Sequence, residues 1–360
     1  MRALFWLSAG LLAYAQVGYG LLLGLLARGR TAVAPAPGGA EPRVSLIVAA
    51  YAEAATIEAK VANALALDWP RERLELIVAV DGAADDTADR ARRAGADVVL
   101  ELPRGGKMRA QDAAVTAASG DLLAFSDANA VWAPDALRAL AGAFADPGVA
   151  YACGQVAFVN DAGTNQEGLY WRYEMWLRAR ESALASVTGG NGAIYAVRPD
   201  DYVVPDVPMG HDLFLPYTLV KRGRRAVYVP EARATEKMVP TIEGEWARKR
   251  RMMNQAWRIV LRGGLADPRG YPPLYALMIA SHRLLRYAAP FLHVLAFVTG
   301  GRRAAFAQSA LLAAALANRP ERPFLIARYY VFTQASLAAG LYDHLRHGTP
   351  DSWELAEGTR

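Results

Sequence analysis

The chain has 360 residues, 53% of them hydrophobic, and a formal net charge of +5. This length suffices for one large domain or two modest ones, and the apolar fraction prompts a search for membrane segments. The only cysteine, Cys153, excludes a disulfide framework and a thiolate metal cluster. The basic residues are not interleaved with aromatic ones as in a nucleic-acid-binding strip. We therefore expect no nucleic-acid partner and attribute the charge to attraction to anionic headgroups or phosphates.

An uncharged apolar run, Ala3 to Leu26, begins the chain and is long enough to cross a bilayer. Arg28 and Arg30 follow it, and positive charge on this side of a span places the following domain in the cytoplasm. A cleavable signal peptide is the alternative, but its apolar core would be shorter and would end in a small-residue site. We expect a transmembrane helix at residues 1–27 and a linker at residues 28–42.

Residues 43–265 begin with short apolar runs alternating with helical patterns, which predicts a mostly parallel α/β sheet covered on both faces. The expected strands are Val44–Ala50, Leu74–Val80, Asp97–Glu101, Leu122–Ser126 and Val149–Phe158. The expected helices lie near Ala54–Ala66, Asp85–Ala94, Lys107–Ala118 and Pro134–Phe144. Beyond residue 160 the pattern predicts two long helices, Gly168–Ala185 and Glu243–Arg262, and a short strand pair, Gly192–Val197 and Ala226–Val229.

Residues 271–345 return to a membrane-like composition. We expect an interfacial helix at Tyr275–Leu285 and two or three crossings within Tyr287–Thr299, Ala304–Ala317 and Phe324–Leu341, before a tail at residues 346–360. At roughly 13 to 18 residues these runs are short for a span, and buried helices of a soluble domain are the alternative.

Acidic residues follow three of the predicted strands: Glu53 the first, Asp81 the second and Asp127 the fourth. Ligands of parallel α/β sheets bind outside the carboxyl ends of the strands, so converging carboxylates there suit a polyhydroxyl ligand, a metal ion or both. Asp127 and Asn129 form an Asp-x-Asn pair whose hard oxygen donors suit Mg²⁺ or Mn²⁺ on a substrate diphosphate. Asp81 could bond a nucleobase edge. The structural alternatives are a helix cap for Asp81 and a solvated first-turn charge for Glu53.

A glycine turn, Arg104-Gly-Gly-Lys107, delivers a lysine to the start of a helix. Backbone amides and a cationic head suit a diphosphate there, although a surface turn explains the segment equally well. The chain lacks the spacing of a P-loop and has no G-x-G-x-x-G after the first strand, which argues against a dinucleotide enzyme.

Two further segments carry candidate chemistry. Gly210-His-Asp212 begins a helix, and Asp212 could act as a general base on a hydroxyl; an N-cap is the alternative. Arg248-Lys-Arg-Arg251 lies on a predicted helix, and one arginine entering the site would stabilise a departing diphosphate. A solvated helix face or a cytoplasmic flank near lipid is the alternative for this run.

In their order, these motifs resemble the family 2 glycosyltransferases, the inverting group that includes synthases of cellulose, hyaluronan and poly-N-acetylglucosamine. The resemblance runs from about Val44 to Arg262, and the apolar flanks resemble the membrane-bound branch of that group. The matching segments are Tyr51-Ala-Glu53, Val80-Asp-Gly-Ala83, Gly106-Lys107, Asp127-Ala-Asn129, Gly190-Asn-Gly-Ala193, Asp212 and Arg248–Met252.

The resemblance implies a GT-A-type α/β domain that transfers a sugar from a UDP-linked donor to a lipid, lipid-linked or polysaccharide acceptor, with Mg²⁺ or Mn²⁺. It implies a multi-pass protein of the inner membrane with a cytoplasmic catalytic domain, and an exporter or other polysaccharide-assembly proteins as partners. The implied catalytic residues are Asp212 and Arg251, and the implied metal ligands are Asp127 and Asn129. The implied substrate-binding residues are Tyr51, Glu53, Asp81, Lys107, Asp127, Gly192 and Arg248.

The sequence departs from the family pattern at three motifs, the first of which is the turn near Tyr51, where Ala52 replaces the usual Asn. Asn129 is a weaker metal ligand than aspartate, and Arg248 and Met252 replace the Gln and Trp of a motif associated with processive synthases. These departures argue against processive polymer synthesis. They also leave open an alternative function, a catalytically weak homologue that serves as a subunit of a polysaccharide assembly complex.

Overall fold

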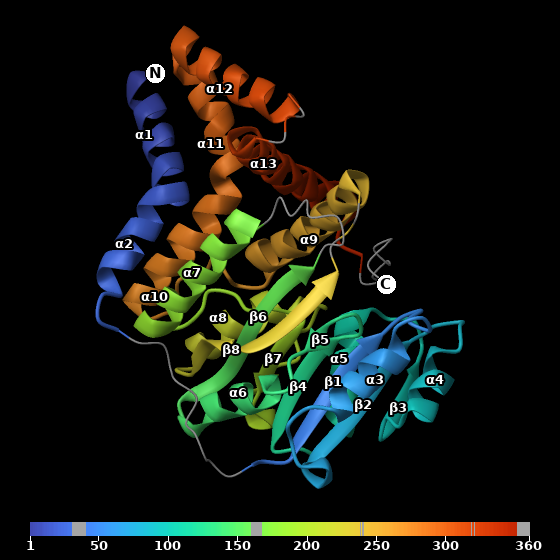
Figure 1. Ribbon diagram of the computed structural model, residues 1–360. Coiled ribbons are helices and arrows are strands. Elements are labelled where there is room, and N and C mark those ends of the chain that lie inside the picture. Colours follow the sequence, from blue (N-terminus) through green and yellow to red (C-terminus); the bar gives the residue numbers. More distant parts are fainter. Residues whose placement is uncertain are drawn as a thin grey trace.

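A mixed, mostly parallel sheet forms the centre of the protein. The computed structural model describes residues 1–30, 41–159, 168–237, 239, 241–317, 319 and 321–350. Most of the predicted linker and the predicted tail beyond residue 350 lie outside these residues. The eight strands follow the order β3-β2-β1-β4-β7-β6-β8-β5 (Figure 1). They are β1 (Val44–Ala50), β2 (Leu74–Asp81), β3 (Val98–Leu102), β4 (Leu122–Asp127), β5 (Val131–Trp132), β6 (Val149–Val159), β7 (Ile194–Val197) and β8 (Arg225–Lys237).

The first four strands of this order explain the near-continuous apolar runs of the sequence. Strands β3, β2, β1 and β4 are parallel, and every residue of β1 is buried. Ile47 and Ala49 belong to the core on one face, whereas Leu46 and Val48 belong to the core on the other. Strands buried on both faces need apolar side chains at consecutive positions, not alternating ones. The predicted doubly covered, mostly parallel sheet is confirmed.

Helices supply the two covering layers. One face is covered by α3 (Ile57–Leu65), α4 (Thr87–Ala94) and α6 (Ala136–Gly142), which contribute Ile57, Ala88 and Leu137 to the core on that face. The other face packs against α5 (Lys107–Ala117), α7 (Gly168–Leu184), α8 (His211–Lys221) and α9 (Ile242–Arg262). Helix α9 begins where the Thr241 hydroxyl accepts a hydrogen bond from the Gly244 amide, as an N-cap does.

The second half of the sheet differs from the prediction. The segments expected to form a strand pair, now within β7 and β8, are not neighbours, because β6 lies between them. Strand β8 is also longer than expected and continues past Pro230 to Lys237. A register shift places Cys153 opposite Tyr228 but Gln155 opposite Arg233, so a bulge at Pro230 absorbs the proline within the strand. Strand β5, which pairs with β8, was not predicted.

One described helical segment is long and apolar enough to cross a membrane. It is Arg2–Leu26, with a mean hydropathy of 1.6, and comprises α1 (Arg2–Ala13), a π-helical turn (Tyr14–Gly18) and α2 (Tyr19–Leu26). The C-terminal crossings predicted from the sequence are not supported, because the helices Leu285–Thr299 and Gly301–Leu316 are only 15 and 16 residues long and Arg328 interrupts the third apolar run. The remaining helical segments are α10 (Pro273–Met278), η5 (Ile279–Leu284), α11 (Leu285–Thr299), α12 (Gly301–Leu316) and α13 (Arg322–His347).

These terminal helices pack on one another and on the sheet domain. Helix α13 packs along α9, and α1 packs along α11. In Figure 1, α1, α11 and α12 extend away from the sheet, and the N-terminus lies beside α12. The helices therefore form a layer beyond the carboxyl ends of the strands, with α9 between that layer and the sheet.

Candidate active site

The principal cavity lies at the carboxyl edge of the parallel strands. It has a volume of about 550 Å³ and is bounded by the ends of β4 and β8 and by α5, α7, α8, α9, η5, α11 and α13. Most of the predicted site residues line it: Glu53, Lys107, Asp127, Asn129, Gly192, Asp212, Arg248 and Arg251. The structure thus gathers side chains that lie up to about two hundred positions apart in the sequence, as the rule for ligands of parallel sheets requires.

Asp81 and Tyr51 lie beside this cavity and are not part of its lining. The Asp81 carboxylate is buried and accepts hydrogen bonds from the Gly105 and Gly106 amides, at 2.6 and 3.0 Å to Oδ1. The Arg104 guanidinium lies 3.5 Å from Asp81 Oδ2 and 3.2 Å above the Tyr51 ring. In this structure Asp81 therefore fixes the glycine turn that presents Lys107.

Gly82 is required for this arrangement. Its φ is +61°, and a Cβ atom there would lie 2.6 Å from the Arg104 amide nitrogen. A residue with a side chain would collide with the backbone of the same turn, and its backbone would be strained as well. Asp81 and Gly82 thus allow the end of β2 to pack against the turn that precedes α5.

Lys107 forms an ion pair with Asp127 inside the cavity. Burial alone would lower the pKa of Lys107, but the nearby carboxylates of Asp127, Asp212 and Glu236 raise it above its ordinary value. Lys107 is therefore a fixed positive charge at the end of β4. A cation held against the carboxylate that is expected to position a metal suits the binding of a diphosphate between them.

Two functional candidates were missed by the sequence reasoning, Glu236 on β8 and Lys60 on α3. Glu236 Oε1 is buried and accepts no hydrogen bond from the described residues. Burial and the Asp127 carboxylate raise the pKa of Glu236 to about 7, against the opposing charges of Lys107, Arg248 and Lys60. Lys60 donates to the Ala130 carbonyl oxygen at 2.7 Å, and burial lowers its pKa to about 7 although Asp127 and Glu236 oppose this.

A signal for Glu236 was present in the sequence. Ala232 and Ala234 are buried on β8, and a strand period of two places residue 236 on the same face. Ending the predicted strand at Val229 removed Glu236 from consideration. Lys60 gave no comparable signal, because a lysine in an amphipathic helix is usually exposed.

Asp212 lies in the first turn of α8, across the cavity from the end of β4. Its carbonyl oxygen accepts from the Gly190 amide at 2.5 Å, which ties α8 to the Gly-Asn-Gly loop. A Cβ atom at Gly192 would lie 3.9 Å from both Asp212 Cγ and Lys107 Nζ. Gly192 therefore keeps open the space between these two charged groups. His211 also lines the cavity, and its Nδ1 lies 3.0 Å from the Tyr195 hydroxyl.

The arginines of α9 bound the cavity from the side of the helical layer. Arg248 forms two hydrogen bonds with Glu245 on its own helix, at 2.7 and 2.8 Å, so its charge is partly balanced. Arg251 lines the cavity one turn farther along the helix. Trp257 is buried against Tyr287 and donates to the Leu337 carbonyl oxygen, so it packs in the helical layer and builds no sugar-stacking wall.

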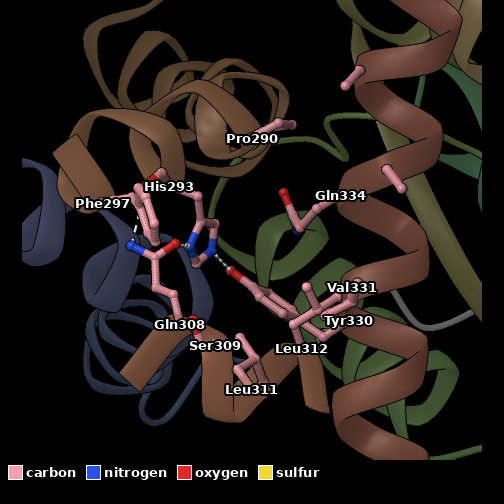
Figure 2. Close-up of a pocket in the computed structure, with 12 residues that line it drawn as sticks. Pro290, His293, Phe297, Gln308, Ser309, Leu311, Leu312, Tyr330, Val331 and Gln334 are labelled. Atoms are coloured by element: carbon pink, nitrogen blue, oxygen red, sulfur yellow. Dashed lines mark hydrogen bonds between the residues drawn. The ribbon is translucent and has the colours of Figure 1, made fainter. Parts of the chain in front are cut away.

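A second cavity, of about 370 Å³, lies among α11, α12 and α13 (Figure 2). Its lining is mostly apolar, and its polar centre is His293, whose Nε2 lies 2.6 Å from the Tyr330 hydroxyl and whose Nδ1 lies 3.3 Å from Gln308 Oε1. No carboxylate and no predicted site residue lines this cavity. The candidate active site is therefore the larger cavity at the sheet edge.

Comparison with known proteins identifies the domain that carries this cavity. Residues 45–198 match the sequence profile described as glycosyl transferase family 2. These residues are therefore similar to a family 2 glycosyltransferase domain. This confirms the resemblance read from the motifs; the matched segment covers strands β1 to β7 and includes every predicted site residue except Asp212, Arg248 and Arg251.

Among curated proteins, the chain is 28% identical over 237 residues to an N-acetylglucosaminyltransferase of Rhizobium leguminosarum bv. viciae, covering 58% of this chain and 54% of that protein. It is also 28% identical over 246 residues to an N-acetylglucosaminyltransferase of Mesorhizobium japonicum, covering 60% and 56%. The chain thus spans about half the length of these curated relatives.

One solved structure is similar over nearly the whole chain. It is the mannosyltransferase PcManGT from Pyrobaculum calidifontis, in complex with GDP-Man and Mn²⁺. The two share 25% identity and superpose with a TM-score of 0.79 over 95% of this chain and 99% of that one. The fold is therefore GT-A-like, and the similarity extends through the helical layer.

Proposed function

We propose that the chain is an inverting hexosyltransferase that moves a sugar from a nucleotide donor, UDP-linked, to a hydroxyl of a lipid, lipid-linked or polysaccharide acceptor. The observation that carries this proposal is the placement of Asp127, Lys107 and Asp212 around one space in the cavity. The relatives that act as N-acetylglucosaminyltransferases and the mannosyltransferase solved with GDP-Man support a nucleotide-sugar donor. A GDP-linked sugar is the donor to test beside the UDP-linked series.

Each residue has a part in this mechanism. Lys107 and the α9 arginines Arg248 and Arg251 bind the donor diphosphate and stabilise the charge that develops on it as the bond to the sugar breaks. Asp212 accepts the proton of the acceptor hydroxyl as its oxygen attacks the anomeric carbon from the opposite face. A single displacement of this kind needs a base but no protein nucleophile.

A divalent metal ion fits the donor end of the cavity. No group of three His, Cys, Asp or Glu side chains in the described ranges lies close enough to hold a metal ion by itself. The available donors, Asp127, Asn129 and the orphaned Glu236 Oε1, are all oxygens, and Mg²⁺ or Mn²⁺ is commonly held by one or two carboxylates together with substrate phosphates. When bound, the ion would neutralise diphosphate charge. The Mn²⁺ in the Pyrobaculum structure supports this assignment.

We also propose that the enzyme acts at the cytoplasmic side of the inner membrane. Residues 43–265 would form the catalytic domain, residues 1–27 its membrane anchor, and residues 271–345 a helical layer against the bilayer. Arg28 and Arg30 after the apolar segment support a cytoplasmic domain. Large apolar side chains on the outer helices support contact with lipid: Leu21, Phe297 and Phe306 are 65%, 48% and 76% exposed.

The proposal is tested by nucleotide release from the detergent-purified protein with a panel of UDP- and GDP-sugars, in Mg²⁺, in Mn²⁺ and in EDTA. We expect metal-dependent release with one donor. Asp212→Asn should lower turnover by about 10²- to 10⁴-fold, the usual contribution of a general base, with nucleotide affinity unchanged. Asp206→Asn, on the exposed loop before α8, is the matched control and should be fully active. A fully active Asp212→Asn would refute the assignment, and silence across the panel would favour the assembly-subunit alternative.

A further inference from the structure

The large cavity is also lined by two arginines with no role in the mechanism above. Arg178 comes from α7 and Arg283 from η5, and both line the cavity together with Gly189 and Tyr287. Two buried guanidinium groups need negative charges nearby. If the protein does not supply these charges, an anionic ligand is expected to supply them.

Among the residues that the structure describes, Arg178 has no acidic partner. Its side chain is 7% exposed, yet its contacts within the described part of the chain are the Met175 sulfur, at 3.7 Å, and the Tyr228 ring, at 5.9 Å. It makes no ion pair with any described carboxylate. Burying a charge without a paired, hydrogen-bonded counter-charge is strongly unfavourable. A side chain of this kind that faces a cavity is expected to meet an anion there.

Arg283 is held in place by a hydrogen bond, and the carboxylates that act on it, Glu174 and Glu181, form their ion pairs with other cations. Its Nε donates to the Thr188 hydroxyl at 3.1 Å, and a Cβ atom at Gly189 would lie 2.3 Å from its terminal nitrogen. The nearest carboxylates are engaged elsewhere. Glu174 pairs with Arg286 and His282, and Glu181 accepts from Tyr19 and lies 2.6 Å from His282 Nδ1. Arg283 therefore makes no ion pair among the described residues.

Both arginines line the same cavity as the proposed general base. Arg283 lies against Gly189, and the amide of the next residue, Gly190, donates to the Asp212 carbonyl oxygen at 2.5 Å. Asp212 also acts on Lys107 at the donor end. One cavity thus connects Asp212 both to Lys107, which it approaches at Gly192, and to the two arginines. An acceptor whose hydroxyl reaches Asp212 would extend toward Arg178 and Arg283.

We propose that Arg178 and Arg283 bind a phosphoryl group of the acceptor, so that the acceptor is a phosphorylated molecule glycosylated on a neighbouring hydroxyl. Guanidinium groups bind phosphate oxygens through paired, charge-assisted hydrogen bonds, which explains two arginines in place of lysines. The phosphate ester belongs either to a lipid headgroup or to a soluble sugar phosphate. This inference rests on the proposed transferase function for the identity of the acceptor, but the phosphate site itself can be tested without turnover.

The test uses the full-length protein and two matched pairs of probes. Phosphatidic acid and diacylglycerol in phosphatidylcholine nanodiscs form the lipid pair, and glucose 6-phosphate and glucose form the soluble pair. We expect the phosphorylated member of one pair to bind at least about tenfold more tightly than its neutral partner, the factor that one charge-assisted hydrogen bond provides. The pair that shows the preference identifies the source of the phosphate.

Substitutions then assign the site. Arg178→Gln and Arg283→Gln should each remove most of that preference, and Arg178→Lys should restore part of it. Arg172→Gln, exposed on the same helix as Arg178, should keep it in full. UDP and GDP affinities, measured on every variant, should not change and serve as the check on folding. If Arg178→Gln does not fold, Arg283→Gln and Arg178→Lys decide the result.

No preference in either pair, or a preference that survives both substitutions, would overturn the inference. Failure of the wild-type protein to bind or turn over any nucleotide sugar, with the phosphate preference intact, would instead count against the proposed function and leave the phosphate site standing.

Discussion

At the scale of single residues, the donor end of the cavity balances its charges in the absence of substrate. Lys107 forms an ion pair with Asp127, whereas Glu236, whose pKa responds to both charges, keeps one buried oxygen without a hydrogen bond from the described residues. A carboxylate of this kind is unfavourable unless a cation joins it. Entry of a divalent ion with the donor diphosphate would supply that cation, so Glu236 should matter for binding before it matters for turnover.

We therefore expect Glu236→Gln to weaken Mn²⁺-dependent UDP or GDP binding by about 10- to 100-fold, as loss of a group that supports a metal site commonly does. Calorimetric titration of the nucleotide in Mn²⁺, and again in EDTA, measures the effect, which should vanish in EDTA. Glu231→Gln, exposed on the same strand, should bind as the wild type does. Equal affinities for Glu236→Gln and the wild type in Mn²⁺ would refute this role.

The residues of the candidate site differ in how well they could be predicted from the sequence. Glu53, Asp127 and Lys107 were predictable because each follows a short apolar strand or a glycine turn, and a parallel sheet brings such positions together. Glu236 was missed because the predicted strand ended at Val229, before the bulge at Pro230, and Lys60 was missed because its burial depends on the packing of α3 against β5. Arg178 was not either, because a helix pattern alone does not reveal which arginine faces a cavity.

At the scale of elements, a buried polar network joins α7 to η5 and to the N-terminal helix. His282 lies between two carboxylates, 2.6 Å from Glu181 and 3.2 Å from Glu174, and the Tyr19 hydroxyl donates to Glu181 at 2.6 Å. Burial would raise the pKa of both carboxyl groups, but Arg286 beside Glu174 and His282 beside both hold their pKa values below 4.5. The network thus ties η5 and the N-terminal helix to α7 through charge.

This network predicts how stability depends on pH. Because the folded-state pKa values of Glu174 and Glu181 lie below the ordinary value of 4.5, their contribution is complete above about pH 4.5 and is lost as the pH falls further. Thermal unfolding in detergent should therefore change little from pH 7 to about 5 and fall steeply below.

Glu181→Gln should lower the stability at pH 7 by about 3–5 kcal/mol, the usual effect of breaking a buried pair, and should flatten the acid limb. Glu101→Gln breaks an exposed pair with Arg92 and should change stability by less than about 1 kcal/mol. An acid limb that stays as steep in Glu181→Gln as in the wild type would contradict the assignment.

At the scale of the whole molecule, sequence composition located the helices correctly but not their relation to a membrane. An apolar run is compatible both with a span and with packing on other helices, and only the packing of α13 along α9 and α1 along α11 separates these cases. The similarity to the Pyrobaculum mannosyltransferase covers these helices as well as the sheet domain. The helical layer is therefore part of the fold and carries one wall of the active site.

The outer surface of this layer leads to the last prediction. Cys153 is buried, so engineered cysteines can be labelled with little background. The label is a polarity-sensitive fluorophore at Leu21→Cys on α2 or at Val298→Cys on α11, both exposed apolar positions. Its emission should lie at shorter wavelength when the protein is reconstituted in lipid vesicles than when an amphipathic polymer keeps it in solution without detergent or lipid. The same label at Glu101→Cys, exposed on β3, should not respond.

A response at Leu21 alone would mean that residues 1–27 anchor the protein and that α11 does not contact lipid. Equal responses at Leu21 and Val298 would place the whole helical layer in the bilayer interface, and with it the acceptor end of the cavity within reach of lipid-linked substrates.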